Sequence, residues 1–143
     1  MNFLDSNIIS RISHIHSECA EFLRAELNKK GLPNLASSHG YILFLLSKEK
    51  NLSMQQISKK INRDKSTTTV LIKKLEKLNL VKSTSSLQDS RIKLIELTSQ
   101  GKTYNEQTLQ ISNELKEKFF KNLSAEEIAS LENTLSKISS NFE

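Results

Sequence analysis

The sequence predicts a mainly α-helical fold with one small β-hairpin, in which a helix-turn-helix unit and the hairpin are flanked by long terminal helices. Three observations predict it. The 143 residues include only 3 Gly and 1 Pro, which is typical of a helix-rich globular chain. The segment 53–98 contains two short helical patterns joined by a polar turn, followed by two β-rich runs. Apolar residues near both ends recur at alternating intervals of three and four, the spacing of helices that pack lengthwise.

Length and composition limit the class of protein. At 143 residues the chain is about one domain long, so a single domain over 1–143 is expected. Its longest apolar run, Tyr41 to Leu46, has six residues, whereas a membrane-spanning helix needs about 20. No membrane span is therefore expected. A single cysteine excludes an intrachain disulfide framework and favours a reducing cytoplasm.

The first helix is expected over about 5–30 and the second from Ser37 or Ser38. In the first helix, Gly31 followed by Pro33 marks the end, because Gly can adopt the left-handed cap and Pro cannot continue a helix. Its apolar seam comprises Ile8, Ile12, Ile15, Cys19 and Phe22. The second helix contains the run 41–46, which is apolar almost all round, so this helix is predicted to be buried.

A helix-turn-helix unit is predicted over about 53–79. Ser53 and Gln56 have the spacing of a capping box, which begins the first helix of the unit. Asn62 and Arg63 form the turn, and Asp64 is the predicted N-cap of a second helix that continues to residue 78. Three side chains per helix are predicted to face the core: Met54, Ile57 and Ile61 in the first helix, and Leu71, Leu75 and Leu78 in the second.

The outward face of the second helix is unusual for a solvated surface. It is predicted to hold Lys65, Ser66, Thr67, Thr68, Thr69 and Lys73. A solvated helix would use Glu, Lys, Gln or Ala, because β-branched Thr is a poor helix former. Hydroxyl and lysine side chains with almost no acids among them suit contacts to phosphates and base edges.

A hairpin and two more helices complete the expected fold. Residues 80–84 and 92–97 read as strands around a polar loop, with Asn79 as a left-handed helix terminator before them. Thr98 caps a long helix that turns Tyr104, Ile111, Leu115 and Phe119 inward. Ser124 and Glu127 begin the last helix with a second capping box. Its seam comprises Ile128, Leu131, Leu135, Ile138 and Phe142. Two such terminal seams exceed what one small domain can cover, which predicts a helical dimer interface.

Basic residues cluster in one part of the chain. From Lys59 to Lys93 there are ten Lys or Arg and three acids, a local net charge of +7 in a chain whose total is +5. The remaining residues therefore carry −2. This asymmetry predicts that the segment faces a polyanion, and a helix-turn-helix followed by a hairpin is one known way to present basic side chains to duplex DNA. The lysines alone would also fit a merely solvated face.

The run Asp89 to Thr98, with the letters DSRIKLIELT, resembles the D-x-R-x5-L-T wing signature of the MarR family of bacterial winged helix-turn-helix transcription regulators. The segments 64–67, 75–76 and 80–81 are similar to that family's recognition helix and its exit. The resemblance implies a winged core over about 36–98, with the wing at about 80–97. It also implies dimerisation helices at about 5–30 and 99–142.

The resemblance further implies a function. It points to a homodimeric repressor that binds a pseudopalindromic operator in double-stranded DNA, and to a small-molecule effector that releases it. Recognition helix and wing are expected to contact DNA through Lys65, Ser66, Thr67, Thr69, Val70, Lys73, Lys74, Asp89 and Arg91. The alternative is an architectural protein that binds DNA or RNA without sequence preference.

Three positions depart from the family pattern. Val70 stands where many members have Arg, so a contact to a thymine methyl would replace a polar base contact. Asn79 stands where most members have Gly, and Asn tolerates the left-handed cap. Ser90 lacks the Arg that many relatives have at the wing tip. Arg91 is then either a minor-groove contact or a partner of Asp89 that shapes the loop.

Other chemistry-bearing residues have structural interpretations. His14, His16 and Cys19 do not share one helix face, so no metal site is expected. Cys19 fits the apolar seam as a small buried residue. His39 and Tyr41 are weak candidates to line an effector crevice, and His39 is otherwise a capping or packing residue. The chain has no H-E-x-x-H motif and no Gly-rich phosphate loop, so neither an enzyme nor a cofactor is expected.

Overall fold

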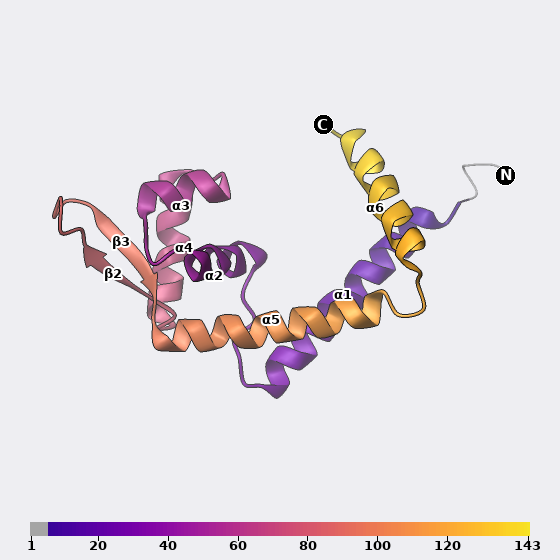
Figure 1. The fold of residues 1–143 in the computed structure, drawn as a ribbon, viewed down its shortest axis with the longest axis horizontal. Helices are drawn as coiled ribbons and strands as arrows, with labels where there is room; N and C mark the ends of the chain where they lie inside the picture. The colour runs from indigo at the N-terminus through magenta and orange to yellow at the C-terminus, as the bar shows by residue number, and fades with distance from the viewer. Residues whose placement is uncertain (1–5) are drawn as a thin grey trace.

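The computed structural model describes residues 6–143 as a winged lobe joined by a long helix to a second helical region (Figure 1). The elements are α1 (Ile8–Lys29), α2 (Ser37–Lys48), β1 (Leu52–Ser53), α3 (Met54–Ile61), α4 (Lys65–Lys77), β2 (Val81–Ser85), β3 (Lys93–Leu97), α5 (Ser99–Phe119) and α6 (Ala125–Ser140). The predicted first helix is confirmed from residue 8, and its expected start at Asp5 lies outside the described residues. No helix within residues 6–143 has the length and apolar character needed to span a bilayer.

The helix ends follow from local chemistry. At the end of α1 Gly31 has φ 64°, and the N–H groups of Gly31 and Leu32 donate to the carbonyls of Asn28 and Leu27. This hydrogen-bond pair satisfies carbonyls that the helix leaves without partners. Asn79 closes α4 in the same way, with φ 58°. The predicted left-handed terminators are therefore confirmed.

The sheet contains one more strand than the sequence predicts. β1 pairs antiparallel with β3 through Leu52 opposite Ile95, and β2 pairs with the other edge of β3, so the strand order is β1-β3-β2. The expected two-stranded hairpin is thus extended by a two-residue strand just before α3. Because Leu52 is 4% exposed, this short strand closes one side of the core.

One hydrophobic core fills the winged lobe. It joins α2, the three strands, α3, α4 and the start of α5, with Ile42, Ile57, Leu75 and Ile95 fully buried. The phenol of Tyr104 in α5 donates to the carbonyl of Pro33 at 2.9 Å, which fixes α5 against the α1–α2 loop. The core therefore holds the helix-turn-helix and the hairpin as one unit.

The expectation that α2 is buried all round is wrong for one face. Ile42, Leu43 and Leu46 are buried, but Tyr41 and Phe44 are each 45% exposed. Their rings stack on one another with centroids 6.4 Å apart. Residues three apart share one face of a helix, and this face of α2 points away from the core.

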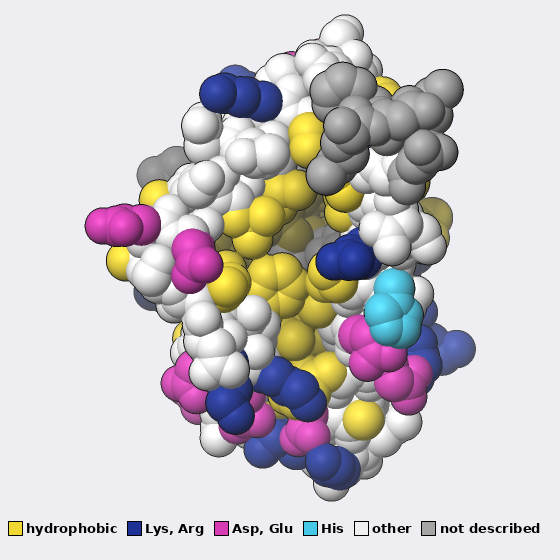
Figure 2. All heavy atoms as spheres, turned by 90° about the vertical axis from the view of Figure 1, so that its right-hand side faces the viewer, with side chains coloured by type: hydrophobic (Ala, Val, Ile, Leu, Met, Phe, Trp, Pro, Cys, Tyr) yellow, Lys and Arg dark blue, Asp and Glu magenta, His cyan; other side chains and the backbone are white. Residues whose placement is uncertain are grey.

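The terminal helices expose their apolar seams. No residue of α6 is buried, and in α1 the seam residues Ile8, Ile12 and Ile15 are 57%, 43% and 44% exposed. Figure 2 views the molecule from this end and shows hydrophobic side chains lining a hollow between the helices. The predicted seams are therefore present, and within one copy of the described chain they remain largely uncovered.

Candidate nucleic-acid interface

Capping side chains position the two helices of the helix-turn-helix unit. Ser53 and Gln56 form the predicted capping box at α3, with hydrogen bonds of 3.2 Å and 2.8 Å. Asp64 caps α4, and its Oδ1 accepts the N–H of Thr67 at 2.7 Å. That hydrogen bond to the charged form lowers the pKa of Asp64. The turn between the helices uses Asn62 at φ 52°, as expected.

The buried face of α4 differs from the predicted stripe. Thr68, Ile72 and Leu75 are at most 1% exposed, whereas Leu71 and Leu78 are only half-buried. Thr68 was expected on the outward face. Its hydroxyl instead donates to the Asp64 carbonyl at 2.8 Å within the core. A hydroxyl that bonds its own helix backbone can be buried without leaving a polar group unpaired.

Because Thr68 is buried, the outward face of α4 is the one opposite Thr68, Ile72 and Leu75. Ser66, Val70, Lys73 and Lys77 follow one another at helical spacing opposite the buried stripe, and all are exposed. Val70 lies in the middle of this row with 67% exposure. Exposing a β-branched apolar residue in mid-helix serves neither the core nor helix propensity.

Thr67 and Thr69 do not share a face. They are two residues apart, and therefore about 200° apart around the helix. The Thr69 hydroxyl donates to the Lys65 carbonyl at 2.8 Å, and Thr69 is half-buried. Thr67 is exposed at the end of α4 that Asp64 caps. The two threonines thus flank the outward face on opposite sides, with Lys74 on the Thr67 side.

The basic side chains are solvent-facing and mostly unpaired. All ten Lys and Arg between 59 and 93 are exposed. Two of them form ion pairs, Lys82 with Glu96 at 3.1 Å and Arg91 with Asp89. Within the part of the chain that the structure describes, the other eight form no ion pair. A cluster of free cations on the helix-turn-helix and hairpin is the surface expected to meet a polyanion.

Asp89 and Arg91 stabilise the hairpin loop together. The Arg91 guanidinium donates through Nε and Nη2 to the two carboxylate oxygens of Asp89, each at 3.1 Å. The Arg91 backbone N–H donates to Asp89 Oδ1 at 3.0 Å. These hydrogen bonds lower the pKa of Asp89. The Arg91 side chain is nevertheless 89% exposed, so the rest of its N–H donors face solvent.

A groove links the hairpin to the helix-turn-helix. Its volume is about 450 Å³, and it is lined by Ser53–Gln55 and Ser58 at α3, by Lys65 at the start of α4, and by 91–93 of the hairpin. Lys65, Arg91 and Lys93 therefore meet around one depression. Of the predicted contacts, the groove brings together Lys65 at the start of α4 and Arg91 of the hairpin.

Two features of the helix-turn-helix unit and the hairpin were not predicted from the sequence. Glu76 of α4 accepts a hydrogen bond from the Ser83 hydroxyl of β2, which ties the second helix of the unit to the hairpin. Leu87 lies at the hairpin tip and is fully exposed, at 105% relative accessibility. Its signal in the sequence was the single apolar residue in the otherwise polar run 83–91.

A crevice of about 250 Å³ lies between α1, α2 and α5. Its lining residues are Leu23, Leu27, Asn34, Leu35, Ala36, Ser37, Gly40, Leu43, Tyr104, Asn105, Thr108, Ile111 and Ser112. Neither His39 nor Tyr41 is among them. Tyr41 lies on the exposed face of α2, whereas His39 is buried toward α4. His39 and Tyr41 as effector-lining residues stay a prediction, and they do not line this cavity.

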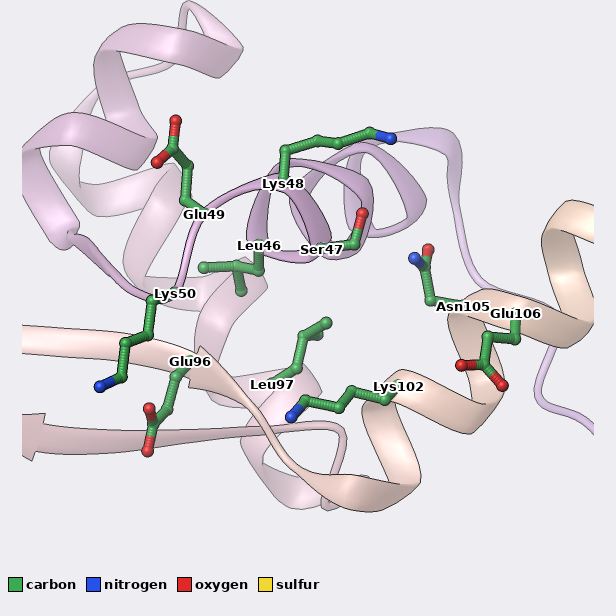
Figure 3. A pocket seen from close by; sticks show the side chains of 10 residues that line it. All are labelled: Leu46, Ser47, Lys48, Glu49, Lys50, Glu96, Leu97, Lys102, Asn105 and Glu106. Atoms are coloured by element: carbon green, nitrogen blue, oxygen red, sulfur yellow. The ribbon is translucent and has the colours of Figure 1, made fainter.

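A larger groove of about 520 Å³ separates the end of α2 from β3 and α5 (Figure 3). Its lining side chains include three lysines, at 48, 50 and 102, and three glutamates, at 49, 96 and 106. Figure 3 shows these side chains spread around an open groove rather than converging on one point. The balanced charge gives no preference for an anion or a cation.

The α1 residues with possible metal or redox chemistry lie apart from the interface. Cys19 is half-buried and lines an apolar groove with Phe22 and Leu115. His14 is exposed, and its Nε2 lies 3.8 Å from Glu18. Among residues 6–143 no three His, Cys, Asp or Glu side chains are grouped as metal ligands would be.

His39 is buried without a hydrogen-bond partner. It is 6% exposed, and neither ring nitrogen is bonded within the described chain. Burial lowers the pKa of His39, and Lys74 of α4 lowers it further. The folded protein therefore protonates this imidazole less readily than the unfolded chain, in which it takes up a proton below about pH 6.5. The free energy of unfolding should fall as pH decreases through that value.

Replacing His39 by Leu should stabilise the protein. An apolar side chain of similar size removes an unpaired buried polar group, which costs about 1–3 kcal/mol. The gain should grow between pH 7 and pH 5, where the wild-type chain loses stability. Urea unfolding across this range measures both effects, with His14→Gln, at an exposed position, as the control. A pH-independent loss of stability in His39→Leu would show that the imidazole is bonded and stabilising.

Comparisons with known proteins identify a family of similar sequences. The model of the MarR family matches residues 35–93. The chain is 32% identical over 112 residues to an uncharacterised HTH-type transcriptional regulator of Bacillus subtilis, YdgJ, covering 76% of this chain and 66% of YdgJ. It is 32% identical over 106 residues to the HTH-type transcriptional regulator SarZ of Staphylococcus aureus, covering 73% and 70%. The chain thus spans about two thirds of each relative's length.

A solved structure shows the same fold. A MepR mutant of S. aureus bound to an oligodeoxyribonucleotide superposes with a TM-score of 0.64. The alignment covers 97% of this chain and all of that one, at 23% identity. The likeness extends over the terminal helices as well as the helix-turn-helix and the hairpin.

Proposed function

Because the chain belongs to the MarR family of HTH-type transcriptional regulators, we propose that it is a homodimeric repressor that binds a pseudopalindromic operator. The recognition helix is α4, and the wing is the hairpin of β2, β3 and the loop between them. Two copies of α4 enter successive major grooves, and the wings reach the flanking minor grooves. Its place of action is the cytoplasm.

The observation that carries the proposal is the set of eight exposed, unpaired cations on α3, α4 and the wing. So many like charges within residues 59–93 repel one another and destabilise the folded chain unless a polyanion neutralises them. Each neutralised phosphate releases condensed counterions, which supplies most of the affinity at low salt. Lys65 and Arg91 line one groove, which supports DNA contacts from the start of α4 and from the wing together.

The terminal helices support a dimer. α6 has 16 residues, none of them buried, and an isolated helix of this length is marginal in water. Leu131, Leu135 and Ile138 are 37%, 42% and 40% exposed along one face. A second copy of α1, α5 and α6 would cover this seam and the hydrophobic hollow in Figure 2. We assign 1–143 as one domain with a winged core at about 36–98.

Contacts on α4 divide by position. Ser66, Thr67 and Val70 lie in its first turns, which a helix-turn-helix inserts into the major groove. We assign Ser66 and Thr67 to polar base or phosphate contacts and Val70 to a thymine methyl. Lys65, Lys73 and Lys74 contact phosphates. We also assign Thr69 as a DNA contact, at the edge of the outward face of α4, where its hydroxyl oxygen can still accept a hydrogen bond.

A salt titration tests this assignment. Val70→Ala should lower the preference for the operator over random DNA, by about 1 kcal/mol for one lost methyl contact. The loss should disappear on an operator in which deoxyuridine replaces the contacted thymidine, since only the 5-methyl group differs.

The control for the same titration is Lys73→Ala. It should weaken operator and random DNA alike and reduce the slope of log affinity against log salt by about 0.9 for one phosphate. If the valine variant loses affinity equally on thymidine and deoxyuridine operators, Val70 does not read that methyl group.

The wing offers a separate prediction. Arg91→Ala should weaken operator binding about tenfold, or about 1.4 kcal/mol, without a change in melting temperature, because the side chain is 89% exposed. Asp89→Asn keeps a side-chain oxygen for the Arg91 backbone N–H but weakens the ion pair. If Arg91 contacts DNA, Asp89→Asn should bind as well as wild type or better, because the wing gains positive charge.

The opposite result defines the other role of Arg91. If Asp89→Asn weakens binding as much as Arg91→Ala does, the pair acts as a brace of the loop rather than through a direct contact. Titration of a fluorescent operator duplex measures both affinities, and thermal unfolding of both variants checks the fold.

We further propose that a small molecule in the crevice between α1, α2 and α5 modulates DNA binding. The crevice contacts α2, which packs on α4, and α5, which leads to the dimer helices. A ligand that changes the angle between α2 and α5 would change the distance between the two recognition helices. The half-site spacing that the dimer can match would then change with it.

A further inference from the structure

Leu87 is placed where a folded chain gains nothing from it. It lies at the tip of the wing, fully exposed, and the wing extends away from the body of the molecule (Figure 1). The loop also contains Ser86, the polar run 88–91 and, next to β3, Ile92, which is 44% exposed. A leucine at this position forgoes the free energy that burial of its side chain would give.

Hydrogen bonds within the loop brace the backbone around Leu87. The N–H of Ser86 donates to the carbonyl of Ile92 at 2.9 Å, and the N–H of Ile92 donates to the carbonyl of Asp89 at 3.0 Å. On the other side, the N–H of Gln88 donates to Ser86 Oγ at 3.2 Å. The ion pair of Asp89 with Arg91 closes the loop. An apolar side chain is thus presented on a braced support, which reduces the entropy lost on binding.

We propose that Leu87 is a minor-groove wedge: it inserts between sugars and base edges at the operator flank while Arg91 stays at the groove rim. This inference rests on the proposed function, in which the wing lies against DNA. The charged residues of the wing, 81–97, are Lys82, Asp89, Arg91, Lys93 and Glu96, a net charge of +1, and α4 beside it carries a net charge of +3. This positive charge favours DNA over an apolar protein surface as the occupant. Apolar wedges of this kind, leucine included, unstack base steps and bend the duplex.

If Leu87 enters the minor groove, the protein should prefer certain base pairs in the operator flank, at positions that α4 does not contact. In the minor groove a G·C pair presents the guanine N2 amino group, which an A·T pair lacks. An apolar side chain entering the groove would collide with that amino group and leave it without a hydrogen-bond partner. Flexible pyrimidine–purine steps such as TA should be favoured as well.

The test uses the full-length protein and three operator duplexes that differ only in the flank facing the wing. One has A·T pairs, one has G·C pairs, and one has inosine·C pairs, which keep the G·C pattern in the major groove but lack the N2 amino group. Wild-type protein should bind the A·T and inosine flanks alike and the G·C flank about tenfold more weakly. Leu87→Ala should bind all three flanks equally. It should also bend the duplex less, which energy transfer between labels at the two duplex ends measures.

Matched variants keep the test interpretable. Leu87→Met should retain the flank preference, and Ser90→Ala, in the same loop, should behave as wild type. If Leu87→Ala still separates inosine from G·C flanks, the wedge is excluded while operator recognition stands. If wild-type protein does not distinguish operator from random DNA, the proposed function itself fails.

Discussion

Replacing Gly101 by Ala should severely destabilise the fold. Gly101 lies in the first turn of α5, against the turn that joins α4 to β2. A Cβ atom at this position would lie 1.9 Å from the carbonyl oxygen of Leu80. That oxygen also accepts the N–H of Thr98 at 3.1 Å, and the Thr98 hydroxyl donates to the carbonyl of Asn79 at 2.6 Å. The added methyl group would force this junction apart.

The size of the opposing free-energy terms shows that Gly101→Ala lowers the free energy of unfolding. Ala is favoured over Gly in a helix by about 1 kcal/mol. Overpacking costs about 1–3 kcal/mol, and each hydrogen bond broken at the junction costs about 1 kcal/mol more. A net loss of about 3 kcal/mol is expected, which is a large share of the 5–15 kcal/mol typical of a domain. Calorimetry and urea unfolding measure it.

Gly40 provides the matched control. It lies in α2 with nothing within 4 Å of a Cβ atom. Gly40→Ala should therefore stabilise the protein by up to about 1 kcal/mol. If Gly101→Ala were as stable as Gly40→Ala, the junction between the α4–β2 turn and α5 would not be as close as described.

Introducing two glutamates into the α6 seam should abolish the dimer. Leu131→Glu together with Leu135→Glu would place charges on the apolar face that we assign to the partner. Because no residue of α6 is buried in one copy, the winged lobe should stay folded. A monomer engages one half-site, so operator affinity should fall about 10²–10⁴-fold with the loss of avidity.

The control places the same charges on the opposite face of α6. Ala129→Glu with Asn133→Glu should remain dimeric and bind the operator, since both residues are exposed and lie away from the seam. Analytical ultracentrifugation and operator titration measure both variants. A seam variant that sediments as a dimer, or a monomer that binds the operator undiminished, would exclude this interface.

Features set by local chemistry could be predicted from the sequence. The caps at Ser53, Asp64, Thr98 and Ser124 depend on a side chain and a backbone group three residues away. The left-handed positions depend on Gly or Asn alone. The basic surface could be predicted because ten Lys and Arg lie within the 35 residues 59–93, and residues so near in sequence lie near one another in the fold.

Features set by packing could not be predicted in this way. The predicted stripe of α4 was Leu71, Leu75 and Leu78. The contacts of α4 with α3 and β2 instead bury Thr68 and Ile72 together with Leu75. The strand β1 has two residues, too few for a periodic pattern. The need for glycine at 101 arises from the backbone of Leu80, 21 positions earlier in the chain.

Selection of bound sequences from random duplex DNA, with the full-length protein at near-physiological salt, tests operator recognition by a homodimer most directly. The selected pool should converge on a pseudopalindrome whose half-sites lie about 10 base pairs apart, one helical turn. Thymine should recur at the position that Val70 faces. A pool that stays random in sequence, with affinity that depends only on salt, would contradict operator recognition and show a basic protein that binds nucleic acid without sequence preference.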